Sequence, residues 1–181
     1  MTTLGIISDT HIKEGGKTVL APIVFKKFAH VDLILHAGDL NTPQTISDLE
    51  AIAPTFAVYG NNCNWDVLRT TPATRLLEIE KVRIGLTHGD VAAPGVKIQL
   101  SGCSGNNHTA ANAMSHFPDA DCIIFGHSHW PLIQWKTRAD GEPVLLFNPG
   151  SAGQKRKALH YSCGILRVDG AQLETELITW G

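Results

Sequence analysis

The stretch IIFGHSHWP, Ile123–Pro131, places two histidines one residue apart at the end of an apolar run. The run is short and contains β-branched isoleucine, which is typical of a strand buried on both faces. Alternate residues of a strand face the same side, so His127 and His129 could hold one metal ion together. The pair could equally transfer protons or simply end the strand. The ends of the other apolar runs help to choose among these alternatives.

Four other short apolar runs also end in residues that can bind metals. The runs are LGIISD, VDLILHAGD, TFAVYGN and VRIGLTHGD, and the residues at their ends are Asp9 and His11, Asp39, Asn61 and His88. In open α/β sheets, groups just beyond the carboxyl ends of strands meet in a common crevice. We therefore predict that these side chains and the histidine pair converge on one site.

The predicted site offers a mixed set of nitrogen and oxygen donors. Imidazoles, two carboxylates and one amide suit Mn, Fe, Zn or Co better than Ca or a thiolate-bound metal. Seven such residues exceed what one tetrahedral ion needs. Two ions about 3.5 to 4 Å apart that share one carboxylate would use them all, and such a pair clamps both oxygens of an in-line displacement at phosphorus.

The order of the elements predicts an α/β fold. Strands alternate with helices in the first third of the chain, where helices are expected from Pro22 to His30 and over residues 43–52. A loop that contains Trp65 follows, then two paired strands and a helix around residues 108–117. The last four segments are PLIQWKTR, EPVLLFNPG, SCGILRVDG and QLETELITW. They show the alternation and turn signals of antiparallel strands. The length of 181 residues indicates a single domain over residues 1–181.

Composition excludes several classes of protein. The net charge of −2 and the absence of a Lys or Arg run argue against a binder of long nucleic acids or membrane surfaces, and leave a small anionic substrate open. Four cysteines without a CxxC pair indicate neither a zinc ribbon nor a disulfide framework. The N-terminus does not resemble a signal peptide, and no segment approaches a membrane span. We expect a cytoplasmic protein.

Five ordered blocks resemble those of the calcineurin-like metallophosphoesterases. The blocks are Asp9-Thr10-His11, Gly38-Asp39, Gly60-Asn61, His88 within THGD, and Gly126-His127-Ser128-His129. The short chain and the later Asn148–Ser151 segment are most similar to the small YfcE-type branch. The resemblance implies a four-layer αββα sandwich, in which two mixed β-sheets are flanked by helices and the metal site lies at the carboxyl ends of the strands.

The resemblance also implies a role for each block. The first ion would be bound by Asp9, His11 and His129, the second by Asn61, His88 and His127, and Asp39 would bridge them. The ions would be divalent, with Mn expected and Fe, Zn, Ni, Co or Mg as alternatives. The implied reaction is hydrolysis of a small phosphodiester or phosphomonoester by in-line attack of a metal-bridging hydroxide. We expect Asp39, Asn61, Asn62 and His88 to form the catalytic group.

Two positions depart from the pattern of the family. Many relatives have a histidine after the metal-binding asparagine, where this chain has Asn62. Its amide can bond a phosphoryl oxygen but cannot act as a general acid, so we expect diesters or acidic leaving groups to be favoured. Trp130 replaces a small hydroxyl residue. It could line the substrate rim and stack on a base or aryl group, or pack on Trp135.

Other interpretations remain beside the enzyme. The retromer subunit of this fold resembles the same family and serves as a scaffold, so a catalytically weak or inactive metal-binding scaffold is the main alternative. Gly15-Gly16-Lys17-Thr18 looks like half of a phosphate-binding loop, but His11 occupies the position of its first glycine. Asn148 and Gly150 are expected to shape a turn under the metal site. Exposed strand edges in the second half could support a homodimer.

Overall fold

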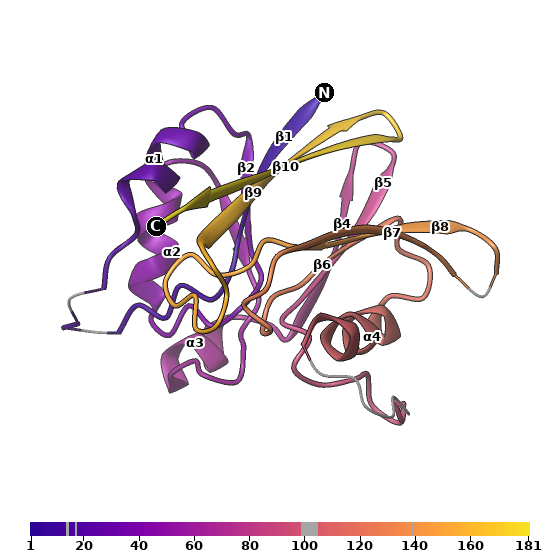
Figure 1. The fold of residues 1–181 in the computed structure, drawn as a ribbon, viewed down its shortest axis with the longest axis horizontal. Helices are drawn as coiled ribbons and strands as arrows, with labels where there is room; N and C mark the ends of the chain where they lie inside the picture. The colour runs from indigo at the N-terminus through magenta and orange to yellow at the C-terminus, as the bar shows by residue number, and fades with distance from the viewer. Residues whose placement is uncertain (14, 17, 99–104, 139) are drawn as a thin grey trace.

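The computed structural model describes residues 1–181 except 14, 17, 99–104 and 139. Cys103 and Lys17, which were considered above, lie outside the described residues. Two sheets of five strands each are packed face to face, with helices on their outer faces (Figure 1). The expected αββα sandwich is therefore confirmed.

The first sheet has the strand order β10-β9-β1-β2-β3. Its strands are β1 (Thr2–Ile7), β2 (Leu33–His36), β3 (Thr55–Ala57), β9 (Tyr161–Asp169) and β10 (Gln172–Trp180). The strands β1, β2 and β3 are parallel, whereas β9 is antiparallel to both β1 and β10. In this register Leu4 lies between Leu33 and Leu166, so β1 is the centre of the sheet.

The second sheet has the strand order β4-β5-β6-β8-β7. Its strands are β4 (Thr74–Ile79), β5 (Val82–Thr87), β6 (Cys122–Ile124), β7 (Leu132–Thr137) and β8 (Pro143–Asn148). The expectation of purely antiparallel strands after β6 is wrong for one pair, because β8 runs parallel to β6 while it is antiparallel to β7. Strand β8 thus carries its C-terminal end, at Asn148, to the same side of the sheet as that of β6.

Four helices connect the strands in the described residues. They are α1 (Pro22–Phe28), α2 (Pro43–Glu50), α3 (Trp65–Thr70) and α4 (Asn106–His116). Helix α3 stands where a loop was expected. Its N-cap is Asn64, whose side chain accepts a hydrogen bond from the backbone N–H of Val67, which stabilises the first turn. None of the described helices is long and apolar enough to span a membrane.

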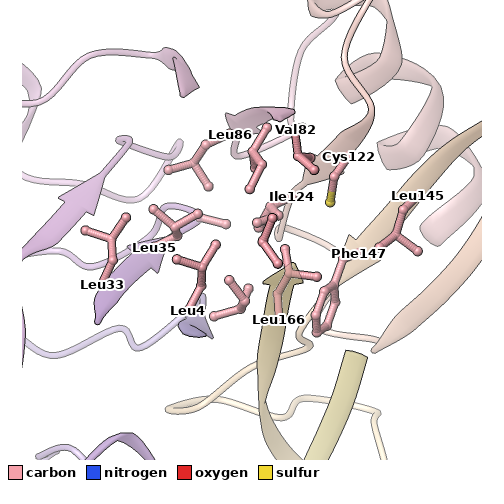
Figure 2. Close-up of a cluster of buried hydrophobic side chains, with 14 of the residues drawn as sticks. Leu4, Leu33, Leu35, Val82, Leu86, Cys122, Ile124, Leu145, Phe147 and Leu166 are labelled. Atoms are coloured by element: carbon pink, nitrogen blue, oxygen red, sulfur yellow. The ribbon is translucent and has the colours of Figure 1, made fainter. Parts of the chain in front are cut away.

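The main core lies between the two sheets. Leu4, Leu35 and Leu166 from the first sheet meet Ile124 and Phe147 from the second (Figure 2). Two further clusters join α1 and α2 to the outer face of the first sheet and α4 to that of the second. Burial on both faces explains why the central strands are almost continuously apolar. The C-terminal ends of β1, β2, β5 and β6 reach the same edge of the sandwich (Figure 1).

Candidate metal centre

Loops that follow four central strands bring the metal-competent residues together. Two backbone hydrogen bonds join the first two loops, from the N–H of Asp9 to the carbonyl of Gly38 (3.0 Å) and from the N–H of His11 to the carbonyl of Asp39 (2.9 Å). The backbone N–H of His127 donates to Asp9 Oδ2 at 3.0 Å. The loops after β1, β2 and β6 are thus tied to one another before any ion is considered.

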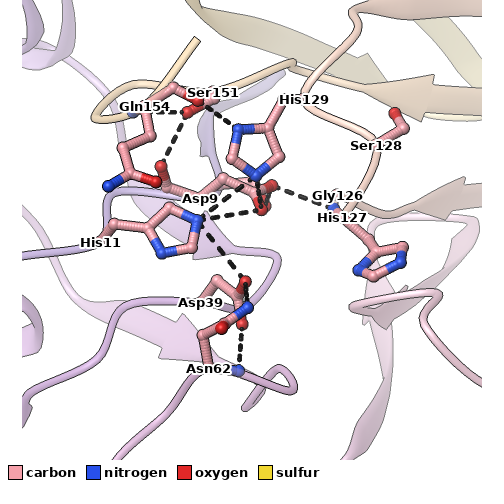
Figure 3. Close-up of polar contacts among 12 residues, drawn as sticks. Asp9, His11, Asp39, Asn62, Gly126, His127, Ser128, His129, Ser151 and Gln154 are labelled. Carbon is pink, nitrogen blue, oxygen red and sulfur yellow. Dashed lines mark hydrogen bonds and ion pairs between the residues drawn. The ribbon is translucent and has the colours of Figure 1, made fainter. Parts of the chain in front are cut away.

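One cluster consists of Asp9, His11 and His129, which face one another in Figure 3. Asp9 Oδ1 lies 3.1 Å from Nε2 of His129 and 3.8 Å from Nε2 of His11. The two imidazole Nε2 atoms are 3.3 Å apart and the rings are stacked. All three side chains are buried. One carboxylate oxygen and two ring nitrogens therefore point into the same small space.

Asp39 connects this cluster to His88. Its Oδ2 lies 3.5 Å from Nε2 of His11, and its Oδ1 lies 3.4 Å from Nε2 of His88. His88 is held from behind, because its Nδ1 hydrogen-bonds the backbone carbonyl of Ala37 at 2.8 Å. That bond fixes the tautomer that leaves Nε2 of His88 facing the carboxylate.

His127 and His129 lie on different sides of the centre. The ring of His127 meets that of His88 edge to face, with ring centroids 5.1 Å apart, and Figure 3 shows it turned away from Asp9 and His129. The intervening Ser128 donates to Asn106 Oδ1 at 2.6 Å. The histidine pair therefore does not point its two rings at one position.

The two asparagines after β3 are placed differently from each other. Asn62 donates to Asp39 twice, through its backbone N–H (2.9 Å to Oδ1) and through Nδ2 (2.7 Å to Oδ2). Both asparagines are exposed, and the side chain of Asn61 makes no hydrogen bond within the described part of the chain. Trp130 is also exposed. The hydrogen bonds to Asp39 thus tie Asn62 to the cluster, whereas no such bond ties Asn61 or Trp130 to it.

Close approach at the centre requires glycine at two positions. A Cβ at Gly38 would lie 2.5 Å from His88 Nδ1, and Gly38 has a φ of +94°. A Cβ at Gly60 would lie 2.6 Å from His88 Cδ2 and would overlap Asp39 Oδ1. Both glycines therefore let loops pass directly beside the ligand side chains.

The backbone is strained at the residues that carry the cluster. Positive φ values occur at Asp9 (51°), His11 (48°), Asp39 (55°), His127 (65°) and His129 (63°). Residues other than glycine rarely adopt this conformation, which persists only where surrounding contacts enforce it and which concentrates at functional sites. Five of the eight such residues in the described part of the chain are thus predicted ligands, and the other three are Asn41, Glu80 and Arg156.

Electrostatics favour charged carboxylates and a protonated His88 in the absence of a cation. Burial would raise the pKa of Asp9 and Asp39, but hydrogen bonds and the charges of neighbouring histidines outweigh it and lower both pKa values. Burial would lower the pKa of His88, yet the nearby carboxylates of Asp39 and Asp9 raise the pKa to about 9. Burial lowers the pKa of His11 and His127.

Two buried atoms of the centre have unsatisfied bonding capacity. Asp9 Oδ1 and His88 Nε2 are inaccessible to solvent and form no hydrogen bond of good geometry to the described residues, although His129 Nε2 lies 3.1 Å from Asp9 Oδ1 and Asp39 Oδ1 lies 3.4 Å from His88 Nε2. Leaving such groups unpaired costs about 1–3 kcal/mol each. A divalent cation would satisfy both atoms, and the mixture of carboxylate oxygens and imidazole nitrogens suits Mn, Fe, Zn or Co. The residues present therefore fit a metal centre.

Comparison with known proteins identifies the family. The model of the calcineurin-like phosphoesterase superfamily domain matches residues 2–171. A probable metallophosphoesterase of Methanothermobacter thermautotrophicus is 38% identical over 178 residues, which cover 98% of this chain and 92% of that protein. The chain belongs to the calcineurin-like phosphoesterase superfamily. The expected class, a hydrolase acting on phosphoester bonds, is thereby confirmed at the level of the family.

Further relatives of this phosphoesterase agree with the fold. A probable metallophosphoesterase of Methanocaldococcus jannaschii is 35% identical over 149 residues, covering 82% of this chain and 67% of that protein. A Vps29 structure from Entamoeba histolytica, solved with zinc, superposes with a TM-score of 0.69 and 18% identity over 98% of this chain and 99% of that chain. At 18% identity, the similarity to the Vps29 structure supports the fold alone.

Several residues that support the phosphoesterase site carried little or no signal in the sequence. Ser151 Oγ donates to the backbone carbonyl of Asp9 (2.8 Å) and accepts from the N–H of Gln154 (2.9 Å), whose carbonyl bonds Nδ1 of His129. Asn148 bonds the carbonyl of Gly126 (2.9 Å) and accepts from the N–H of Gly150 (2.9 Å). The expected turn under the metal site is confirmed, and it holds two of the loops that carry ligands.

His36 is a further buried residue beside the site. Its Nδ1 accepts a hydrogen bond from the N–H of Gly38 at 3.2 Å, and its Nε2 lies 3.1 Å from Thr10 Oγ1. These bonds require the neutral ring with the proton on Nε2. Burial lowers its pKa to about 4. His36 thus supports the turn before Asp39 as an uncharged side chain.

Proposed function

We propose that this chain is a dinuclear metal-dependent phosphoesterase that hydrolyses a small phosphodiester or phosphomonoester. The observation that carries the proposal is the position of Asp39, whose two oxygens face His11 at 3.5 Å and His88 at 3.4 Å. A carboxylate between two histidine groups is what a pair of ions needs in order to share one ligand.

Each cluster has a proposed ion. Asp9, His11 and His129 would hold the first, and His88 and His127 would hold the second, with Asp39 shared. Two bound cations would activate a water molecule near neutral pH and neutralise the developing charge on the phosphoryl oxygens. The role of the protein is to fix the spacing between the ligands. The strained loops, which are hydrogen-bonded to one another, support this role.

The amide of the second cluster is assigned less directly. The family resemblance gives Asn61 as the ligand, whereas the contacts of the structure favour Asn62, which already donates to Asp39. We propose Asn61 as the ligand and Asn62 as the residue that orients Asp39 and bonds a phosphoryl oxygen of the substrate. Neither amide can serve as a general acid, so diesters and esters with acidic leaving groups should react best. Trp130, with 45% of its surface exposed, would border the substrate.

Manganese is the proposed metal, because the mixed oxygen and nitrogen ligands suit it, with Fe, Zn, Ni, Co and Mg as the other candidates. The rival proposal is a metal-binding scaffold without useful turnover. Buried ligands at Asp9, Asp39 and His88 would serve either protein, so the enzyme is favoured by the match to the phosphoesterase family model and to probable metallophosphoesterases.

The test begins with protein stripped of metal by a chelator. Reconstitution with Mn, Ni, Zn or Mg should restore hydrolysis of chromogenic phosphodiesters and phosphomonoesters, and Asp39→Asn should remove most of that activity because the shared carboxylate loses its charge. Background rates with every metal, or full activity of the variant, would rule out the enzyme. Binding of metal without turnover would support the scaffold.

A further inference from the structure

A pocket of about 560 Å³ opens between the loop after β1 and the N-terminal ends of α2 and α3. Its wall continues the segments that carry the proposed site residues, because Ile12 directly follows His11 and Asn64 stands two residues after Asn62. The pocket and the metal centre are therefore walled in part by the same two chain segments. The volume of the pocket is in the range of small-molecule sites.

The lining offers hydrogen-bonding groups of both kinds. Asp48 and Asp66 provide carboxylates, and Gln44 and Asn64 provide amides. Asp48 is oriented by Gln44, whose Nε2 donates to its Oδ1 at 2.8 Å. Lys13 is the one cation among the described lining residues. The described lining residues therefore carry more negative than positive charge.

This lining discriminates among the groups that an ester could carry. Among the described lining residues, a second anionic group would face two carboxylates and one ammonium, which is unfavourable. A plain alkyl or aryl arm would desolvate the carboxylates without giving them a partner. Hydroxyl groups can donate to Asp48 and Asp66 and accept from Lys13, since a hydroxyl is both donor and acceptor. Ile12 and Val19 offer apolar atoms to the C–H face of such a group.

Thr42 provides an independent observation. It lines the pocket and is the N-cap of α2, yet its side chain makes no capping hydrogen bond. Its Oγ1 is buried and has no partner among the described residues, and the residue is 5% exposed. A threonine at an N-cap ordinarily bonds the helix N-terminus. Its unused hydroxyl lies at the wall of the pocket but is closed to solvent in this structure.

We propose that the pocket binds a neutral polyhydroxylated ester arm of the substrate, such as a glyceryl or sugar group. The inference rests on the proposed function, since it takes the metal centre beside the pocket as the place where the phosphoester is cleaved. It adds the chemical class of the group attached to phosphorus.

The kinetic test compares two diesters that share a leaving group, p-nitrophenyl glyceryl phosphate and p-nitrophenyl propyl phosphate. The wild type should prefer the glyceryl diester in kcat/KM by about tenfold or more, as expected for hydrogen bonds to charged groups. Asp48→Ala should lower that preference about tenfold. Glu50→Ala is the matched control, because Glu50 is an exposed acid of the same helix, and it should keep the preference. Equal kcat/KM values for both diesters in all three proteins would overturn the proposal.

A binding test separates failure of the pocket from failure of the proposed function. Glycerol 3-phosphate and propyl phosphate are titrated into magnesium-loaded protein, and backbone amide shifts are followed by NMR. Glycerol 3-phosphate alone should move the amides of Thr18, Gln44 and Asn64. Such shifts without hydrolysis of either diester would support the pocket and contradict the phosphoesterase function. Unmoved pocket amides would overturn the pocket, whether or not the diesters are hydrolysed.

Discussion

Ser151 holds Asp9 from behind, since its Oγ donates a 2.8 Å hydrogen bond to the backbone carbonyl of Asp9. The two residues are 142 positions apart in the chain, yet both are completely buried. The same oxygen accepts from Gln154, whose carbonyl bonds His129. One hydroxyl therefore supports two of the three proposed ligands of the first ion.

Ser151→Ala should weaken the first metal site. Loss of a partner that orients ligands typically costs 10- to 100-fold in metal affinity, and the unpaired buried groups should lower the free energy of unfolding by about 1–3 kcal/mol. Competition with a chromogenic chelator measures the affinity, and urea unfolding measures the stability. Ser162→Ala is the control, because Ser162 is equally buried and its Oγ has no partner among the described residues. Similar losses in both variants would show that Ser151 acts only through packing.

The histidine pair should divide between the two ions. His129 lies 3.1 Å from Asp9 Oδ1, whereas the ring of His127 meets His88. We expect His129→Ala to retain one ion with the affinity of the second site, and His127→Ala to retain one with that of the first. Metal content and titration calorimetry of each variant distinguish the two sites. Equal loss of both ions from either variant would contradict the division.

Asn61→Ala and Asn62→Ala separate a ligand from a supporting residue. Asn62→Ala removes one of two hydrogen bonds to Asp39, because the backbone N–H remains, so metal affinity should fall by about 10- to 100-fold. Asn61→Ala should cause a larger fall if Asn61 reaches the second ion as proposed. Calorimetric titration of both proteins with Mn²⁺ gives the comparison. A smaller effect at Asn61 than at Asn62 would transfer the ligand role to Asn62.

Leaving-group dependence should reveal the absence of a general acid. Asn62 stands where a histidine would protonate the departing oxygen, and an amide cannot do so. A series of aryl phosphodiesters should therefore show log kcat falling steeply as the pKa of the leaving group rises. A flat dependence in wild-type protein would demonstrate an acid elsewhere in the site.

The strand ends could be predicted because their signal is local and repeated. An apolar run that ends in Asp or His defines both the strand and the edge where its end lies, so Asp9, Asp39 and His88 were placed together correctly. The direction of β8 could not be predicted from such a local signal. Its parallel pairing with β6 joins two strands between which β7 lies in the chain. The cap at Asn64 was overlooked beside the exposed Trp65, and α3 was missed.

Choices between neighbouring polar residues depended on the folded backbone. Which of two adjacent asparagines turns toward Asp39 is decided by the turn after Gly60, whose missing side chain admits the carboxylate. The role of Ser151 could not be predicted either. A serine after Pro149 and Gly150 predicts a turn, but it does not predict the contact with Asp9 after β1.

His36 should make stability depend on pH between about 4 and 6.5. Its pKa is about 4 in the folded protein, against 6.5 for the free side chain, so the unfolded chain takes up the proton first as pH falls. The unfolded state is then favoured, and stability from this group is present above pH 6.5 and lost toward pH 4. Between pH 7 and pH 5 the loss should be about 2 kcal/mol.

His36→Gln removes this titration while an amide can still bond Gly38 and Thr10. The variant should be less stable than wild type at pH 7, because the fit to these partners is poorer, but its disadvantage should shrink by about 2 kcal/mol at pH 5. Urea unfolding of both metal-free proteins at the two pH values gives the difference, in which the titrations of the other histidines largely cancel. Equal pH dependence in the two proteins would mean that His36 becomes protonated within the folded structure.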